Sequence, residues 1–413
     1  MMIDAHDTRS SRSGERGPSA PQAGAFAGRR LLFVVNEGFF LLSHRREVMR
    51  SARAAGFELH VAAPPHHAWA PEDFDLDQLA AEGAIVHPFP MSRRGLNPVT
   101  DAETFLALLR LYRRVKPDVV HHVTIKPNLY GGLAARLLGV PSAVFAVPGL
   151  GEVFSGNPAL IRLLRPAIGR ALGIAFAHPN CRIIVQNEED RGQLVRRRMA
   201  PPDRIVLIRG SGVDTAKFVP APIPPGVPVV VMAARLIWDK GVAEFVEAAR
   251  RLRASGIAAR FVLVGASHPS NPRAVPEADL LAWEKEGVVE WWMFRKDMGA
   301  VLSSAAVVCL PSTYGEGVPK ILLEAAAVGR ATVTTDTPGC RDAVVDGRTG
   351  LLVPPGDAQA LSVALRRLLT DAPLRDAMGA AARERVAAEF DEGEVAARTL
   401  AVYSALMSAP AAE

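Results

Sequence analysis

Arg235 and Lys240 are the residues whose types and spacing point most directly to chemistry. They lie five positions apart, between the end of an apolar, strand-like run at 227–233 and the start of the next helical pattern. Two cations beside a helix N-terminus, where the helix dipole adds favourable potential, can grip the adjacent phosphates of a diphosphate. For this pair alone, a surface loop with two solvated charges explains the pattern equally well.

A glycine-containing loop that leads into a helix adds polar groups of a second kind. Pro319 suits the first helical turn, where its missing N–H costs nothing, so the N–H groups near Gly317 and Val318 can point toward a phosphate or a sugar hydroxyl. Glu316 stays on the loop, and Glu324 lies about a turn and a half into the helix, where it can accept hydrogen bonds from a ribose diol. An exposed helix acid is the usual explanation for a residue such as Glu324, but the loop and the paired cations favour function here.

Further candidates follow other strand-like runs, because ligands of parallel α/β sheets bind at the carboxyl ends of the strands. Gly265 ends one run, and without a side chain its backbone can approach a ligand closely. His122 ends another, although a satisfied structural histidine is the usual explanation for such a residue. Lys126 and Asn128 open the helix that follows, where they are placed to meet a phosphate.

Several other kinds of site are disfavoured. The dinucleotide fingerprint G-x-G-x-x-G and the P-loop motif are both missing from the expected places. The 3 cysteines are widely separated and unpaired in spacing, so we expect reduced packing residues. Two D-x-D patterns within 73–77 lie at a predicted helix start and are interpreted as capping charges. Because Arg235 and Lys240 would neutralise a diphosphate, we expect no metal.

These residues must be positioned by a repeating αβ architecture. Apolar runs rich in β-branched residues alternate with amphipathic segments, which is typical of βα units around a parallel sheet. A Gly- and Pro-rich break at 210–226 divides the alternation. The sequence therefore predicts an α/β fold with two doubly wound, Rossmann-like domains that face a cleft. We expect a disordered extension over 1–27, domains over 28–217 and 218–390, and a C-terminal helix and tail over 391–413.

Composition is consistent with that architecture. The chain has 413 residues, of which 49% are hydrophobic and 22% charged, enough apolar material for substantial cores. Residues 28–217 hold 25 Lys and Arg against 17 Asp and Glu, whereas 218–413 hold 20 against 23. This asymmetry favours an anionic membrane surface or a phosphorylated substrate facing the first domain, and no interleaved aromatics or motif point to nucleic acid. The segment 157–177 reads equally well as a membrane-surface amphipathic helix or as a solvated face over a core helix.

Taken together, the motifs resemble the family 4 glycosyltransferases of the GT-B fold, in particular the bacterial capsule and O-antigen branch that extends lipid-linked sugars. The resemblance runs from about Leu31 to Glu389. It rests on the E-x7-E pair Glu316 and Glu324, on Arg235 and Lys240, and on the segment 347–354.

The resemblance implies a retaining hexosyl- or N-acetylhexosaminyl-transferase. Its donor would be a nucleotide sugar, with UDP as the expected nucleotide, and its acceptor a hydroxyl of a polyprenyl-diphosphate-linked sugar in cell-envelope polysaccharide synthesis. In the family the first glutamate contacts the donor sugar, the second holds the ribose, a strand-end histidine bonds the sugar, and the stretch matching 291–297 lines the nucleobase. The implied catalytic residues are His122, Arg235, Lys240 and Glu316; the implied donor-binding residues are Gly265, Gly317, Val318, Lys320 and Glu324; the implied acceptor-binding residues are Phe39, His44, Lys126 and Asn128.

The implied partners are the sugar donor, the lipid-linked acceptor and an anionic membrane surface, without nucleic acid, cofactor or metal. We expect a cytoplasmic protein at the inner face of the cytoplasmic membrane, since residues 1–27 lack the apolar region of a signal peptide and no apolar run is long enough to span a bilayer. Two alternatives remain open: a nucleotide-sugar epimerase of the same fold, and a non-catalytic sugar-nucleotide-binding protein.

Overall fold

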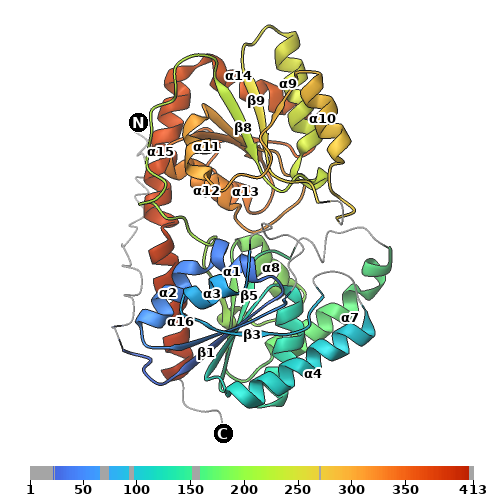
Figure 1. Cartoon of the computed structure of the whole chain (residues 1–413), viewed down its shortest axis with the longest axis vertical. Coiled ribbons are helices and arrows are strands. Elements are labelled where there is room, and N and C mark those ends of the chain that lie inside the picture. Colours follow the sequence, from blue (N-terminus) through green and yellow to red (C-terminus); the bar gives the residue numbers. More distant parts are fainter. Residues whose placement is uncertain are drawn as a thin grey trace, which may run out of the picture.

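The computed structural model describes residues 22, 24–65, 74–92, 97–150, 159–268 and 271–408. It has two lobes, each built on a parallel sheet with helices on both faces (Figure 1). Two doubly wound α/β units are therefore present, as the alternation of apolar and amphipathic segments predicts. Within the described ranges, no helix combines the length and the apolar character needed to cross a bilayer.

The first lobe contains a seven-stranded sheet in the order β3-β2-β1-β4-β5-β6-β7. Its strands are β1 (Arg30–Val35), β2 (Glu58–Ala63), β3 (Ile85–Pro88), β4 (Val119–Val123), β5 (Ser142–Val147), β6 (Cys181–Val185) and β7 (Ile205–Leu207). Most of their residues are buried, because helices cover both faces of a parallel sheet. The strand order reverses beside β1 and β4, so a crevice opens at their carboxyl ends.

Helices on the two faces of this sheet enclose separate hydrophobic cores. They are α1 (Gly38–His44), α2 (Arg46–Ala54), α3 (Asp77–Ala81), α4 (Pro98–Val115), α5 (Gly132–Leu137), α7 (Ala159–Phe176) and α8 (Glu188–Arg196), with a π-helical turn η1 (Pro127–Gly131) and a 3₁₀ turn η2 (Pro202–Arg204). Local signals set several ends: the Asn97 side chain caps α4, which has Pro98 in its first turn, and the Asn187 side chain caps α8.

The second lobe contains a six-stranded parallel sheet in the order β10-β9-β8-β11-β12-β13. Its strands are β8 (Val229–Ala233), β9 (Arg260–Val264), β10 (Glu290–Trp291), β11 (Val307–Leu310), β12 (Ala331–Thr335) and β13 (Gly350–Val353). Its helices are the 3₁₀ turn η3 (Trp238–Lys240), α9 (Val242–Ala254), α10 (Glu277–Lys285), α11 (Met298–Ser304), α12 (Lys320–Ala327), α13 (Cys340–Ala343), α14 (Ala358–Thr370) and α15 (Ala372–Glu389). The strand ends of this sheet face those of the first lobe (Figure 1).

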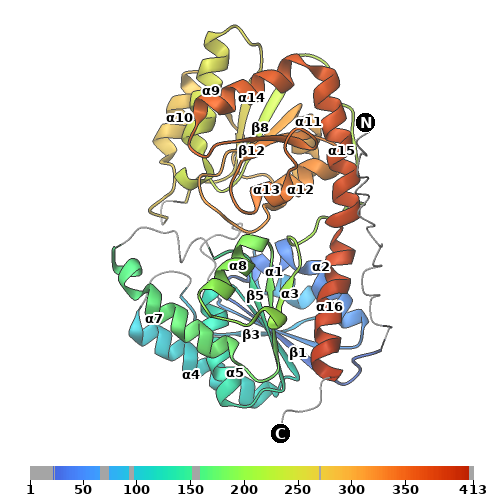
Figure 2. The ribbon, with the colours of Figure 1, turned by 180° about the vertical axis from the view of Figure 1, so that it is seen from behind.

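The last helix, α16 (Glu392–Ser408), returns to the first lobe. Figure 2 shows α15 and α16 running along one side of both lobes. Tyr403 is fully buried and its hydroxyl lies 2.6 Å from His121 Nδ1, while the Leu406 carbonyl accepts from the Asn180 amide at 2.9 Å. The sequence predicts a helix here, but not that its apolar face completes the core of the other lobe.

Residues 24–27 differ from the predicted disordered extension. Phe26 is 4% exposed, and its ring stacks on Phe57 with 4.3 Å between centroids. The Phe26 N–H also donates to the Ala55 carbonyl at 2.9 Å. One aromatic residue among small and polar neighbours carries no periodic signal, so its burial depends on a partner from α2 and the loop after it. The rest of the predicted extension, residues 1–21 and 23, lies outside the described residues.

Candidate active site

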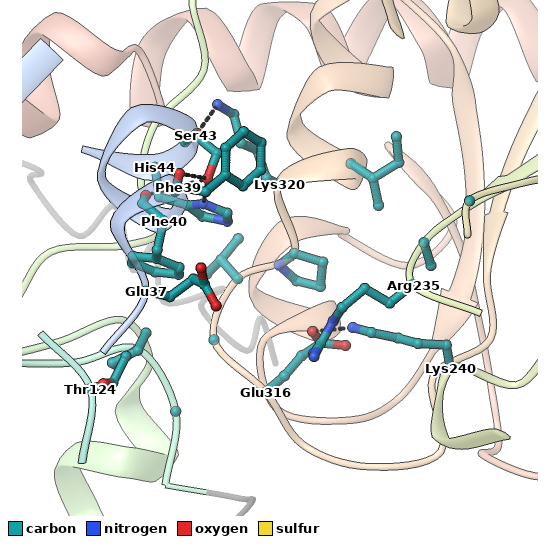
Figure 3. Close-up of a pocket in the computed structure, with 18 of the residues that line it drawn as sticks. Glu37, Phe39, Phe40, Ser43, His44, Thr124, Arg235, Lys240, Glu316 and Lys320 are labelled. Atoms are coloured by element: carbon teal, nitrogen blue, oxygen red, sulfur yellow. Dashed lines mark hydrogen bonds and ion pairs between the residues drawn. The ribbon is translucent and has the colours of Figure 1, made fainter. Parts of the chain in front are cut away.

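A pocket of about 990 Å³ lies between the two lobes and is lined from both. Its walls come from the segments that follow β1, β4 and β5 in the first lobe and β8, β9 and β11 in the second. Figure 3 shows α1 residues on one side facing Arg235, Lys240 and Glu316 on the other. The pocket therefore occupies the position where carboxyl ends of parallel strands meet.

Arg235, Lys240 and Glu316 come together in this pocket, as the diphosphate hypothesis requires. The Lys240 ammonium is ion-paired with the Glu316 carboxylate and lies 5.5 Å from the centre of the Tyr314 ring. Burial is the largest single influence and lowers the pKa of Lys240, but the charge and hydrogen bond of Glu316 together with Tyr314 outweigh it, so the net pKa lies above its usual value. Lys240 is therefore a protonated, 7% exposed cation.

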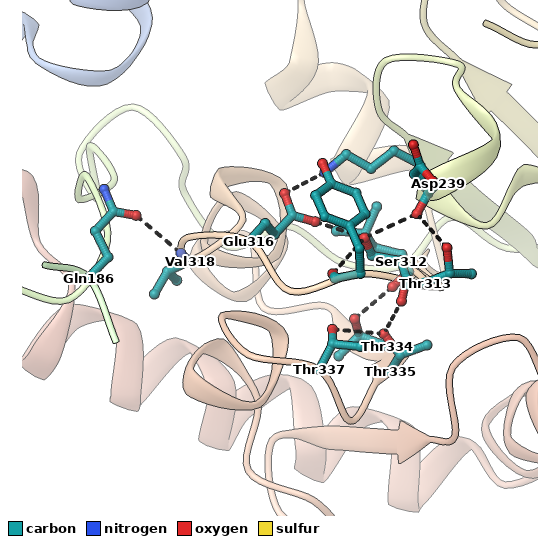
Figure 4. Close-up of polar contacts among 12 residues, drawn as sticks. Gln186, Asp239, Ser312, Thr313, Glu316, Val318, Thr334, Thr335 and Thr337 are labelled. Atoms are coloured by element: carbon teal, nitrogen blue, oxygen red, sulfur yellow. Dashed lines mark hydrogen bonds and ion pairs between the residues drawn. The ribbon is translucent and has the colours of Figure 1, made fainter. Parts of the chain in front are cut away.

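The loop that carries Glu316 is held from behind by short polar contacts (Figure 4). Ser312 Oγ donates to Glu316 Oε1 at 2.9 Å, and Thr335 Oγ1 donates to the Ser312 carbonyl at 2.6 Å. The Thr313 N–H donates to the Asp239 carbonyl at 2.9 Å, which joins this loop to the turn before Lys240. The carboxylate and the ammonium are thus fixed before any ligand binds.

Glu324 and Lys320 line the same pocket from α12. Burial raises the pKa of Glu324 to about 6, and Lys320 only partly opposes this, with its Nζ 3.9 Å from Glu324 Oε1. Lys320 Nζ also donates to the Ser43 carbonyl of the first lobe. Lys320 therefore links the predicted ribose-binding glutamate to the opposite wall.

Two of the predicted glycines are required by close backbone approach. Gly265 lines the pocket with φ 148°, and a Cβ there would overlap the Ala234 carbonyl oxygen. A Cβ on Gly317 would overlap the Pro148 carbonyl oxygen of the first lobe. The expectation of a free N–H at Val318 is wrong, because this N–H donates to Gln186 Oε1 at 3.2 Å.

The first-lobe wall contains Phe39 and His44, as predicted for an acceptor side. The His44 ring stacks on Phe40 at 4.3 Å, and Nδ1 lies 2.7 Å from Ser43 Oγ. Burial, followed by the charge of Lys320 and then those of two arginines, lowers the pKa of His44 to about 3. The imidazole is therefore neutral at physiological pH.

Of the two residues predicted to follow β4 into the site, Lys126 lines the pocket and Asn128 does not. Lys126 lines the pocket, where its Nζ is ion-paired with Asp101 at 2.9 Å. Asn128 does not reach the pocket: it is fully buried, and its Nδ2 donates to the Ala146 carbonyl at 3.0 Å. The prediction for Asn128 is wrong because the turn η1 directs this side chain back to β5.

His122 is also a structural residue and not a pocket residue. It is fully buried, its Nε2 lies 2.7 Å from the Tyr112 hydroxyl, and its ring stacks on Phe145 at 5.2 Å. Burial lowers its pKa to about 3. Along β4, His121 and His122 point to opposite faces of the sheet and both enter the cores, so the predicted sugar contact from His122 is wrong.

The chain reaches the pocket two residues after His122, at Thr124. Thr124 has φ 76°, an unusual value for a β-branched residue, and its Oγ1 donates to Asn36 Oδ1 at 2.9 Å. Backbone strain of this kind is common in binding sites. No feature of the sequence signals a positive φ at a threonine.

The predicted nucleobase segment contributes less than expected. Within 291–297, Phe294 and Arg295 line the pocket, whereas Trp291 and Trp292 do not. Trp291 Nε1 donates to the Gly265 carbonyl at 2.9 Å, so the tryptophan supports the strand end from behind. Both tryptophans pack against the cores of the second lobe and do not line the site.

Glu37 and Gln186 line the pocket but were not among the predicted site residues. They are 7% and 5% exposed, respectively. Each is polar and follows a buried strand directly, β1 for Glu37 after Asn36 and β6 for Gln186, so their place after a strand was the available signal. No cluster of His, Cys, Asp or Glu that could hold a metal ion is present within the described part of the chain.

Comparisons with known proteins agree with the fold and with the family that the motifs resemble. The sequence model of the family "glycosyl transferases group 1" matches residues 214–385. The sequence model of the family "glycosyl transferase 4-like" matches residues 30–181. The N,N'-diacetylbacillosaminyl-diphospho-undecaprenol alpha-1,3-N-acetylgalactosaminyltransferase of Campylobacter jejuni is 28% identical over 387 residues, which cover 91% of this chain and 98% of that protein.

A second relative and a solved structure extend the likeness. The alpha-maltose-1-phosphate synthase of Mycolicibacterium smegmatis is 30% identical over 369 residues, covering 80% of this chain and 90% of that protein. The crystal structure of HepE from Anabaena in complex with UDP matches with a TM-score of 0.73 at 16% identity, over 91% of this chain and 100% of that one. This structural likeness confirms the expected fold.

Proposed function

The chain belongs to the family 4 glycosyltransferases of the GT-B fold, and we propose a donor, an acceptor and a stereochemical course for its reaction. The donor is a UDP-sugar, the acceptor is a hydroxyl of a polyprenyl-diphosphate-linked sugar of the cell envelope, and the anomeric configuration is retained. The observation that carries this proposal is one pocket in which the cations and glutamates of the second lobe face Phe39, His44 and Lys126.

The named relatives support these substrates. The Campylobacter jejuni protein is named for a diphospho-undecaprenol-linked sugar and an alpha-1,3 linkage, and the Anabaena structure contains UDP. A diphosphate bears the charge that Arg235 and Lys240 can neutralise, and the pocket continues past them to an apolar wall that includes Phe39 and Leu129. Donor and acceptor would therefore meet between the lobes.

The proposed mechanism uses the charges of this chain. As the bond between the sugar and the diphosphate breaks, Arg235 and Lys240 stabilise the negative charge that develops on UDP. The acceptor hydroxyl attacks from the side that UDP vacates, and its proton passes to the leaving diphosphate. Glu316, held by Lys240 and Ser312, orients the sugar without becoming a nucleophile.

Transfer of radiolabelled sugar from UDP-sugars to a polyprenyl-diphosphate-linked acceptor tests the proposal. Arg235→Ala and Lys240→Ala should each lower kcat about 10²-fold or more, because each removes charge stabilisation of the leaving group. Arg250→Ala is the control, since Arg250 lies on α9, exposed and paired with Glu286. Near-wild-type turnover in both pocket variants would contradict the assignment.

The same assay separates the two alternatives and tests the metal expectation. An epimerase would convert the UDP-sugar without acceptor, and a binding protein would retain it unchanged. Because two side-chain cations face the diphosphate site, we propose that turnover needs no divalent ion. Activity should therefore survive EDTA, and a loss that Mg²⁺ restores would refute this part of the proposal.

We also propose that the first lobe rests on the anionic inner face of the cytoplasmic membrane. Arg110 and Arg113 are exposed on α4, and Arg170 is exposed on α7. Figures 1 and 2 show α4 and α7 on the same side of the first lobe, away from α16. This placement would bring a lipid-linked acceptor to the pocket from the membrane side.

A further inference from the structure

Gln186 is a pocket residue to which the proposed mechanism assigns no role. It follows β6 directly, and its neighbour Asn187 caps α8 and donates to the Glu316 carbonyl oxygen at 3.4 Å. Gln186 therefore stands where the first lobe touches the loop that carries Glu316. Gln186 as a whole is only 5% exposed.

The partner of Gln186 determines the orientation of its amide. The Val318 N–H can only donate, so the amide atom 3.2 Å from it is the oxygen, and the nitrogen takes the other position. Figure 4 shows this nitrogen on the side of the amide away from Val318. Among the described residues, Gln186 Nε2 has no hydrogen-bond partner, and the residue lines the pocket. A ligand that reaches Nε2 would therefore meet two N–H donors.

The backbone beside this amide is held by neighbouring contacts. Asn187 Nδ2 donates to Asp190 Oδ2 at 2.9 Å, and Asp190 Oδ1 accepts from the Leu150 N–H at 3.2 Å. On the other side, a Cβ on Gly317 would overlap Gln186 Oε1, so only glycine permits this contact. A donor that is already oriented loses little conformational entropy when it binds a ligand.

We propose that Gln186 recognises the sugar of the donor. Its Nε2 donates a hydrogen bond to a sugar oxygen, a hydroxyl or an acetamido carbonyl, beside the Glu316 loop, while Oε1 keeps the lobes joined through Val318. The inference rests on the proposed function and deepens it, because it gives the first lobe a sugar contact, the role that the sequence predicted for His122. UDP without a sugar does not make this contact.

Binding of UDP and of four UDP-sugars (glucose, galactose, N-acetylglucosamine and N-acetylgalactosamine) by calorimetry tests the inference. Gln186→Glu keeps an oxygen that accepts from Val318 but has no N–H, whereas Gln186→Met loses both functions. The measured quantity is the ratio of the Kd for UDP to the Kd for the best-bound UDP-sugar, because a general electrostatic effect of the new carboxylate acts on both ligands. Gln359→Glu is the control, since Gln359 is exposed on α14 outside the pocket.

Both Gln186 variants should lower this ratio by about 3- to 10-fold, the value of one neutral hydrogen bond, and raise KM for the donor more than they change kcat. Gln359→Glu should leave the ratio unchanged. A wild-type ratio in Gln186→Glu would overturn the inference and leave Gln186 as a lobe contact alone. A wild-type protein that binds no UDP-sugar more tightly than UDP would also overturn it.

Failure of the proposed function is visible separately. If the ratio changes as expected but no sugar reaches a lipid-linked acceptor, the acceptor proposal fails and the role of Gln186 is supported. Because UDP binding reports on the second lobe whereas Gln186 follows β6 of the first, urea denaturation of each variant is the check that an altered ratio does not come from a misfolded first lobe.

Discussion

A dehydrated ammonium such as Lys240 needs a counter-ion, and in this pocket the counter-ion is Glu316, the glutamate that faces the proposed sugar site. The two side chains are 8% and 17% exposed, so removal of either leaves a charge that water solvates poorly. Binding and stability are therefore coupled at Glu316, and turnover has to be measured together with unfolding.

Glu316→Gln should lower the free energy of unfolding by about 3 kcal/mol and reduce kcat, because Lys240 stays buried without its partner charge. Urea denaturation and the transfer assay measure the two effects. Glu290→Gln is the matched control: Glu290 pairs with Arg260 at the surface, with exposures of 38% and 47%, and should change stability by less than about 1 kcal/mol. Equal losses in the two variants would contradict the role of burial.

The pH dependence of kcat/KM for the UDP-sugar should follow the ionisation of Glu324. Its carboxylate has to be ionised to accept hydrogen bonds from the ribose diol, and burial raises its pKa to about 6. As pH falls through about 6, Glu324 takes up a proton, so kcat/KM for the UDP-sugar should decrease. His44, with a pKa of about 3, stays neutral throughout this range. Glu324→Gln should remove the inflection; an unchanged profile in this variant would rule out Glu324 as its source.

At the scale of elements, β4 shows how a strand divides neighbouring residues between two cores. His121 contacts Tyr403 of α16 on one face of the sheet, and His122 contacts Tyr112 of α4 on the other. The pocket begins only after the strand, where Thr124 turns the chain with a positive φ. A shift of one residue in the register of a strand moves every side chain to the other face, so a strand-end prediction depends on where the strand ends.

His122→Ala should destabilise the protein by about 2 kcal/mol or more while kcat per folded molecule changes less than about 3-fold. The loss comes from a cavity beside Phe145 and from the Tyr112 hydroxyl, which loses its partner. Tyr112→Phe removes the same hydrogen bond without the cavity and should cost less. A fall in kcat of about 10²-fold without loss of stability would instead identify a catalytic histidine.

The exposed charges of α4 should control membrane affinity. Arg110→Ala combined with Arg113→Ala should weaken binding to phosphatidylglycerol vesicles by about 10- to 30-fold, at roughly 1 kcal/mol per charge. Co-sedimentation at two salt concentrations measures it, with phosphatidylcholine vesicles as the neutral reference. The matched control removes Arg366 and Arg367, which are exposed on α14 of the second lobe. Equal loss in both double variants would contradict a membrane-facing first lobe.

At the scale of the whole molecule, the lobes make contacts between residues far apart in the sequence. Across the pocket, Gln186 accepts from Val318 and Lys320 donates to the Ser43 carbonyl. On the opposite side, α15 leads directly into α16, which packs against α2 and the first sheet (Figure 2). Helix α16 is thus part of the first core, and the stability of that lobe depends on it.

Tyr403→Ala should therefore destabilise the first lobe by about 3–5 kcal/mol, because a fully buried ring that contacts Phe57 and His121 is lost. Tyr403→Phe keeps the ring and should cost only about 1–3 kcal/mol for the unpaired His121 nitrogen. Urea denaturation followed by far-UV circular dichroism measures both. An alanine variant as stable as wild type would show that α16 is dispensable for the first lobe.

Local patterns were sufficient for the α/β class and for the division into two lobes, whereas the convergence of Arg235, Lys240 and Glu316 was expected only once the family resemblance was added. Helical and strand periodicities are properties of short segments, and the carboxyl ends of parallel strands must meet at one edge of a sheet. A residue that follows a strand can therefore be assigned to the cleft before its neighbours are known.

Side-chain direction and distant contacts could not be obtained in that way. The burial of His122 and Asn128 depends on which core each backbone position faces. The hydrogen bond from the Val318 N–H to Gln186 Oε1 joins residues 132 positions apart. The place of Tyr403 in the first core likewise depends on a partner, His121, 282 positions earlier. Such contacts arise from the packing of whole elements, because a hydrogen bond or an apolar face is satisfied by whichever segment the fold brings near it.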